Sequence, residues 1–159
     1  MKMKVQVSEE LQLSQVGGLY RIGAWVRIPA KASEVFELLA DPRKHDTFDG
    51  SGTVKGMLSG PNRLYLNAVF SMDMKMIVPY RIQNRVIEFE EGRKIAWCHI
   101  GRHVWRYLLE DDGAQGCKVT EIFDWERAYS SLLYEMLQIP ERNGRAIVAT
   151  LTRLRDQFI

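Results

Sequence analysis

The chain has 159 residues, of which 46% are hydrophobic and 26% are charged, and its formal net charge is +2. This composition is typical of one ordered globular domain with a buried core, and it excludes a disordered chain. The small net charge gives no reason to expect a nucleic acid as partner. The sequence lacks both a signal-peptide pattern and a run of about 20 apolar residues, so we expect a cytoplasmic protein without membrane insertion.

Two cysteines, Cys98 and Cys117, stand alone in the sequence, outside any CxxC pattern. Neither a disulfide framework nor a structural zinc site is therefore predicted. The glycine-containing stretch at residues 49–52 follows a helical pattern and precedes a strand, which is the reverse of the order found in phosphate-binding loops. No GxGxxG motif follows a predicted strand, so we expect no nucleotide cofactor, and no other cofactor is indicated.

The first elements of the chain are predicted from strand and helix propensities and from residues that typically start or end a helix. Residues 1–18 alternate charged and apolar side chains, and we interpret them as an N-terminal extension. Residues 19–28 are rich in β-branched and aromatic side chains and predict a strand. Residues 33–39 have helical apolar spacing, and Asp41 followed by Pro42 is a typical start for a second short helix.

After residue 52 the apolar period changes to two, which indicates strands. Candidate strands cover residues 53–58, 63–72 and 75–90, and three more lie between Lys94 and Glu126. Glycine, proline, asparagine and aspartate separate them, so we expect hairpins and an antiparallel sheet.

The last predicted element is a helix over residues 143–158. It carries an apolar stripe at the spacing i, i+4, i+7 and i+11, formed by Ile147, Leu151, Leu154 and Phe158. This helix is the only element large enough to cover the apolar face of the sheet. A curved sheet around a single helix leaves space between them, and we expect a cavity there.

Alternate residues of the last three strands form one unusual face, because residues two apart in a strand share a side. A loop at residues 100–102 fixes the register, so that His99 faces His103, Trp97 faces Trp105 and Ile95 faces Tyr107. The third strand adds Val119, Glu121, Phe123 and Trp125 to this face, with Glu121 opposite either Trp105 or Tyr107. Such a surface is typical of a core and of a ligand cavity wall.

The element order and several segments resemble the START-like (Bet v 1-like, SRPBCC) superfamily, specifically its polyketide cyclase/dehydrase-like branch. The resemblance covers residues 19–159 and rests on IPAKASEVFELLADPRKHDTFDGSG (residues 28–52) and on residues 72–110, 118–126 and 140–147. It implies one ligand-binding domain with the α+β helix-grip fold. In that fold, a seven-stranded antiparallel sheet wraps around a long C-terminal helix, and two short helices follow the first strand. Phe48 stands where the family frequently has tryptophan.

This resemblance, together with the aromatic face, predicts a protein that binds an apolar small molecule, either aromatic, polycyclic or lipid-like. The expected ligand contacts are Tyr80, Asn84, Trp97, Trp105, Tyr107, Phe123, Ile147 and Leu151. The oligomeric state stays open between monomer and homodimer.

The alternative is a polyketide cyclase or dehydratase. Partial burial would raise the pKa of Glu121, and Glu121 with His103 or His99 would then transfer protons. The structural alternative for the same residues is internal hydrogen bonding within the core. No metal site is predicted, because the two histidines have only Glu121 nearby as a third ligand and show no recognisable ligand spacing.

Overall fold

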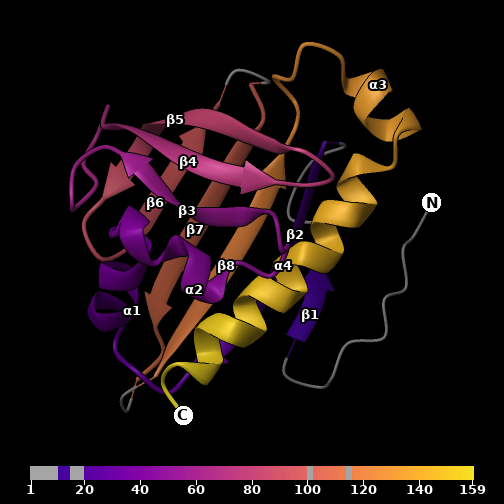
Figure 1. The fold of residues 1–159 in the computed structure, drawn as a ribbon. Coiled ribbons are helices and arrows are strands. Elements are labelled where there is room, and N and C mark those ends of the chain that lie inside the picture. The colour runs from indigo at the N-terminus through magenta and orange to yellow at the C-terminus, as the bar shows by residue number, and fades with distance from the viewer. Residues whose placement is uncertain (1–10, 15–19, 100–101, 114–115) are drawn as a thin grey trace.

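The computed structural model describes residues 11–14, 20–99, 102–113 and 116–159. Its centre is one antiparallel sheet in the order β1-β2-β8-β7-β6-β5-β4-β3. The strands are β1 (Leu11–Ser14), β2 (Arg21–Ile28), β3 (Val54–Ser59), β4 (Val69–Lys75), β5 (Pro79–Glu90), β6 (Lys94–Cys98), β7 (Val104–Asp111) and β8 (Cys117–Asp124). The sheet curves, and its concave side faces the C-terminal helix (Figure 1).

The helices lie at the sheet edge and across the concave side. After β2 come α1 (Ala32–Leu39), a 3₁₀ turn (Pro42–Lys44) and the single-turn α2 (His45–Phe48). After β8 come α3 (Ser131–Met136) and the long α4 (Ile139–Asp156). This arrangement confirms the predicted α+β helix-grip fold, with seven strands from β2 onward. In the part of the chain that the structure describes, no helix is long and apolar enough to cross a bilayer.

The strand β1 lies within the predicted N-terminal extension. It pairs antiparallel with β2, where Leu11 is opposite Val26 and Ser14 is opposite Gly23. It therefore adds an eighth strand at the edge of the sheet. The other residues of the extension, 1–10 and 15–18, lie outside the described residues.

The register of the β6–β7 hairpin is as predicted. Ile95 pairs with Tyr107 and Trp97 pairs with Trp105. The loop residues 100 and 101, from which this register was predicted, lie outside the described residues. On the next strand Glu121 pairs with Tyr107, which decides between the two partners expected from the sequence.

The predicted strand over residues 63–72 is wrong in its first half. Asn67 adopts a left-handed backbone with φ of 69°, which a continuous strand does not allow. The backbone N–H of Leu64 donates to the carbonyl oxygen of Ala40 at 2.7 Å. The start of this segment is thus hydrogen-bonded to the end of α1, and β4 begins only at Val69.

The helix α4 begins earlier than predicted, at Ile139. Pro140 lies in its first turn, where the missing N–H of proline has no helical partner to lose. The fully buried side chains of Ile147, Leu151 and Leu154 pack this helix against β2 and β8. The same side chains anchor the largest helix to the sheet and form part of the main core.

The loop between α2 and β3 lies directly against α4. The backbone N–H of Gly50 donates to Oγ1 of Thr150 at 2.8 Å. A Cβ at this glycine would lie 2.3 Å from the backbone nitrogen of Thr150. Backbone meets backbone here, so no side-chain movement can relieve the overlap.

We therefore expect Gly50→Ala to lower the free energy of unfolding by about 3 kcal/mol, because the loop must move away from α4. The measurement is urea unfolding followed by circular dichroism. Gly52→Ala is the matched control, since its Cβ would meet open space and its positive φ of 74° costs only about 1 kcal/mol. Equal losses in the two variants would contradict the close approach at Gly50.

Candidate functional site

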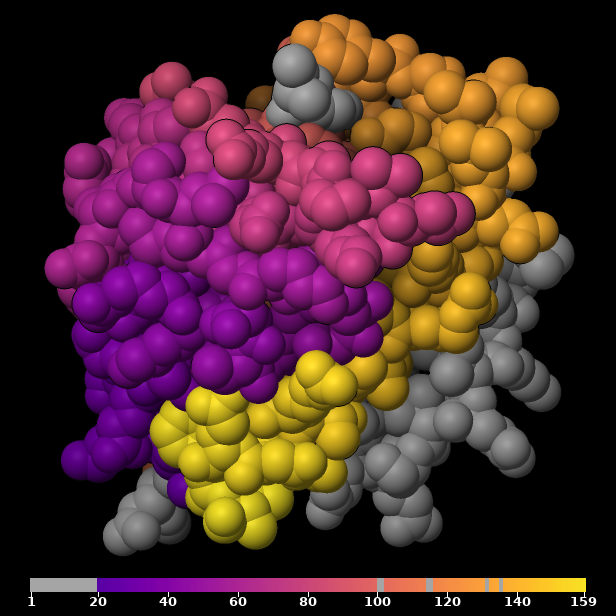
Figure 2. Space-filling view, in the orientation of Figure 1, coloured from indigo at the N-terminus to yellow at the C-terminus, as the bar shows by residue number. Residues whose placement is uncertain are grey.

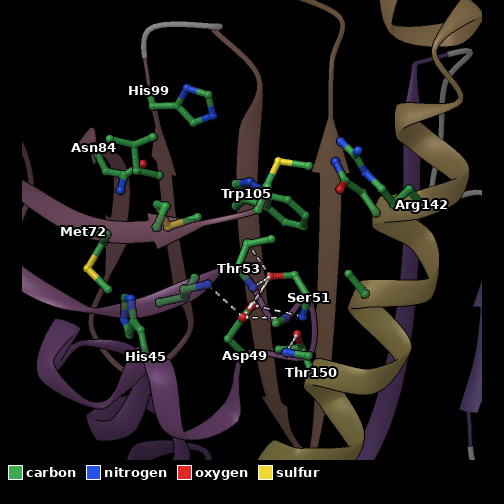
Figure 3. Close-up of a pocket in the computed structure, with 18 of the residues that line it drawn as sticks. His45, Asp49, Ser51, Thr53, Met72, Asn84, His99, Trp105, Arg142 and Thr150 are labelled. Atoms are coloured by element: carbon green, nitrogen blue, oxygen red, sulfur yellow. Dashed lines mark hydrogen bonds between the residues drawn. The ribbon is translucent and has the colours of Figure 1, made fainter. Parts of the chain in front are cut away.

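A cavity of about 810 Å³ lies between the concave face of the sheet, the α2–β3 loop and α4. Most of its wall is apolar, with aromatic side chains from β6 and β7 and methionine side chains from β4 (Figure 3). Polar side chains enter at separate points, among them Asp49, Asn84 and Arg142. The elements that build this wall are far apart in the sequence, and the sheet pairing brings them together.

A strongly perturbed group on the wall is the carboxyl of Glu121. The hydroxyl of Tyr107 on the neighbouring strand donates to its Oε1 at 2.9 Å, and both side chains are buried. Among the described residues, Oε2 of Glu121 has no hydrogen-bond partner. The carboxyl therefore presents one satisfied and one unsatisfied oxygen at the cavity.

Burial raises the pKa of Glu121 from its ordinary value of 4.5 to about 8, because a carboxylate loses its hydration there. The hydrogen bond from Tyr107 acts in the opposite direction, and the negative charge of Asp49 adds to the rise. At neutral pH the side chain is thus mainly a carboxylic acid. It can donate a hydrogen bond to a molecule in the cavity.

Asp49 ends α2 and organises the loop that follows. Its carboxylate accepts hydrogen bonds from the backbone N–H groups of Ser51, Gly52 and Val54 and from the hydroxyl of Ser51. These donors hold the charge of Asp49 at the cavity wall (Figure 3), where it acts on the carboxyl of Glu121. The role of Asp49 is therefore to fix the loop and to set the local potential.

His45 contributes a neutral ring. Its Nε2 lies 2.8 Å from the carbonyl oxygen of Leu39, which can only accept, so Nε2 carries the proton. The ring stacks on Trp97 with centroids 4.9 Å apart, and burial lowers its pKa. This histidine fixes the tryptophan that forms the centre of the aromatic wall.

The predicted pair His99 and His103 is present, with ring centroids 3.9 Å apart. Nδ1 of His103 lies 2.8 Å from the hydroxyl oxygen of Tyr134 in α3. Burial, together with the neighbouring His99, lowers the pKa of His103 to about 3. Both rings are therefore uncharged at neutral pH. Within the described ranges no group of three His, Cys, Asp or Glu side chains is arranged to hold a metal ion.

The structure separates the histidine pair from the carboxyl. Val104, next to His103, pairs with Asp124 at the end of β8. Glu121 lies three residues before Asp124 and pairs with Tyr107. The proposed proton-transfer residues therefore divide into two locations on the wall. Tyr107, not a histidine, is the hydrogen-bond partner of the carboxyl.

Five of the eight expected ligand contacts line the cavity: Tyr80, Asn84, Trp97, Trp105 and Tyr107. The other three, Phe123, Ile147 and Leu151, are fully buried in the core and do not reach it. Phe123 is packed between Trp105 and Trp125, with ring centroids 4.9 and 5.5 Å away.

The position of α4 explains the two helix residues. Its apolar stripe faces β2 and β8, and its cavity side lies roughly a quarter of a turn around the helix. The α4 residues that line the cavity are Ile139, Arg142, Asn143, Arg145, Ala146 and Thr150. Because these residues are of mixed polarity, they form no apolar stripe in the sequence. The apolar pattern therefore identified the side of the helix that packs in the core instead of the side that lines the cavity.

The residues of the β4 wall are not among the ligand contacts expected from the sequence. Phe70, Met72 and Met74 alternate along the strand and point into the cavity, where Phe70 pairs with Asn84 of β5. Sulfur-containing side chains of this kind adapt to irregular ligands as well as to irregular cores. The period of two was the available signal, but it does not distinguish a cavity wall from a core.

The comparisons with known proteins concern mainly the fold. No family model matches the chain. Among solved structures, a protein of Rhodobacter sphaeroides is 10% identical, with a TM-score of 0.70 over 93% of this chain and 97% of its own. The Polyketide_cyc-like protein Cgl2372 of Corynebacterium glutamicum is 19% identical, with a TM-score of 0.55 over 85% of this chain and 88% of its own. The chain has the START-like (SRPBCC) helix-grip fold.

One curated relative is closer in sequence. The uncharacterized protein Rv0088 of Mycobacterium tuberculosis is 37% identical over 143 residues, which is 87% of this chain. The chain spans 64% of the length of this relative. The match covers most of this chain and assigns no ligand.

The raised pKa of Glu121 predicts how stability depends on pH. Unfolding returns the pKa of the carboxyl from about 8 to its ordinary value of 4.5. Between pH 4.5 and pH 8, unfolding therefore releases a proton from this group. The contribution of this group to stability is therefore complete below pH 4.5 and is lost as the pH rises to 8. Glu121→Gln keeps a neutral side chain of the same shape and should gain stability relative to the wild type, by a few kcal/mol, as the pH rises from 5 to 8.

Urea unfolding of the wild type and of Glu121→Gln across this pH range measures the difference in their free energies of unfolding. Because the histidines are present in both proteins, their contribution cancels in this difference and that of Glu121 remains. Glu110→Gln, on an exposed carboxylate of β7, is the control and should show no such trend. A constant difference between Glu121→Gln and the wild type across the range would show that the carboxyl is ionised in the folded protein.

Proposed function

We propose that this protein binds an apolar small molecule, aromatic, polycyclic or lipid-like, in the cavity between the sheet and α4. The observation that carries the proposal is a pair of unpartnered polar atoms on an apolar wall. Oε2 of Glu121 and Oδ1 of Asn84 are buried and have no hydrogen-bond partner among the described residues. Each unsatisfied atom costs about 1–3 kcal/mol, and hydroxyl or carbonyl groups of a ligand would recover that energy.

The size and entrance of the cavity support the same proposal. Its volume of about 810 Å³ falls within the range of about 300–1,000 Å³ that is usual for small-molecule sites. On the side shown in Figure 2 the β4–β5 turn reaches α4, and the turn carries exposed apolar side chains, with Ile77 94% exposed. Exposed apolar side chains beside a pocket are typical of a binding site.

Binding can be tested with N-phenyl-1-naphthylamine, a neutral probe whose fluorescence rises in apolar surroundings. We expect saturable binding to the wild type and about tenfold weaker binding to Trp105→Ala, which removes the half-buried indole from the wall. Trp25→Ala is the control, because Trp25 pairs with Thr120 and stacks under Lys118 on the other face of the sheet.

Circular dichroism and thermal unfolding establish that both variants are folded. If the folded wild type binds neither this probe nor other members of a broad apolar panel, the proposal fails. Equal affinities of the two tryptophan variants would place the probe outside the cavity.

A second candidate function, a cyclase- or dehydratase-type enzyme, is favoured by the protonation state of Glu121. A carboxylic acid with a free Oε2 can donate to a ligand carbonyl and so acidify the neighbouring C–H group, whose proton passes to solvent. Since His99 and His103 lie elsewhere on the wall and are neutral, this proposal assigns the acid role to Glu121 alone. We further infer a cytoplasmic location, with which the free thiols of Cys98 and Cys117 are compatible.

The test uses 1-tetralone, an apolar bicyclic ketone, in D₂O. The wild type should accelerate deuterium exchange at the carbon next to the carbonyl, and the acceleration should decline as the pH rises through about 8, where the acid form is lost. Glu121→Gln should bind the ketone and give no acceleration. Exchange at the full rate in this variant would remove Glu121 from the mechanism and leave binding as the function.

A further inference from the structure

The opening of the cavity carries three cations. Lys75 ends β4, and Arg142 and Arg145 lie near the start of α4, and all three line the cavity with exposed side chains. None of the ion pairs formed among the described residues includes any of them. By contrast, Arg21, Arg63 and Arg106 elsewhere on the surface each contact a carboxylate.

The charges on the cavity wall do not cancel. At neutral pH Glu121 is mainly uncharged and the lining histidines are neutral, so Asp49 is the one lining carboxylate in the described part of the chain that carries charge. Three cations against one anion leave two positive charges on the wall. The carboxylate of Asp49 is already surrounded by four donors in its own loop and makes no ion pair with the cations at the opening.

The position of Arg142 in α4 adds to this excess of positive charge. The N-terminal end of a helix carries partial positive charge, so cations are disfavoured there and anions are favoured. Arg142 lies in the first turn of α4, which begins at Ile139, whereas Arg145 lies beyond that turn, where the effect has fallen off. Glu141 is the acidic side chain of the first turn, and it forms no ion pair with Arg142 among the described residues.

We propose that the ligand is an amphipathic organic anion, with its apolar body in the cavity and its anionic group between Lys75, Arg142 and Arg145. This inference rests on the proposed binding function and adds the chemical class and the orientation of the ligand. Two independent features support it: the unbalanced cations at the opening, and the unpartnered buried atoms of Glu121 and Asn84 deeper in the cavity. A carboxylate and a phosphate monoester share the required chemistry.

Two fluorescent probes of nearly identical shape test the charge directly. 8-Anilino-1-naphthalenesulfonate carries a sulfonate, and N-phenyl-1-naphthylamine has the same ring system without it. The wild type should bind the anionic probe about fivefold to tenfold more tightly at low salt, and the difference should shrink as the salt concentration rises.

The double variant Arg142→Gln/Arg145→Gln should lose this preference and keep its affinity for the neutral probe. Lys55→Gln/Arg93→Gln is the matched control, since it removes the same two charges from exposed positions away from the cavity and should keep the preference. Displacement of the bound probe by decanoate, decyl phosphate and decanol then distinguishes the head groups. Decanoate or decyl phosphate should displace it at lower concentration than decanol, and the stronger of the two identifies the anion.

The outcomes separate this inference from the one on which it rests. Binding of the neutral probe with no preference for the anionic one, or a preference that survives in the arginine double variant, overturns the anionic ligand and leaves the apolar cavity function in place. Equal displacement by decanol and by both anions has the same meaning. Failure of the wild type to bind either probe overturns both proposals.

Discussion

The packing of α4 on one side of the sheet determines where the cavity lies. The buried residues Ile147, Leu151 and Leu154 hold this helix against β2 and β8. A single helix is about 10 Å wide and cannot cover a curved sheet of eight strands, so the inner faces of β4 to β7 need another cover. The α2–β3 loop and the β4–β5 turn close part of that gap, and the remaining space is the cavity.

The chemistry of the wall follows from the same geometry. Because alternate residues of a strand share one face, the pairing that buries Val119 and Phe123 also buries Glu121. The cost of removing its charge from water is avoided by protonation, and Tyr107 satisfies one of its oxygens. The result is an uncharged acid in an apolar wall, while the charged groups of the cavity lie at its opening and in the Asp49 loop.

The sequence allowed much of this arrangement to be predicted where local patterns are decisive. Strand alternation and turn residues were sufficient for the β6–β7 register and for the burial of Glu121. The course of residues 63–68 was missed, because it depends on Asn67 and on a hydrogen bond to the distant Ala40. The rotation of α4 was missed for a related reason. An apolar stripe shows which side of a helix is buried, but a cavity wall need not be the most apolar side.

The separation of the two sides of α4 has a consequence for how this protein can change. The residues that hold the helix to β2 and β8 are different from those that line the cavity, since Ile147 and Leu151 belong to the first set and Ala146 to the second. Substitutions on the cavity side of α4 thus alter the shape and charge of the binding space with little effect on the packing of the helix, whereas Phe70, Met72 and Met74 of β4 belong both to the cavity wall and to the core. On α4, ligand selectivity and folding stability are encoded by separate residues, so changes on this helix can adapt the cavity to a new ligand without first loosening its attachment to the sheet.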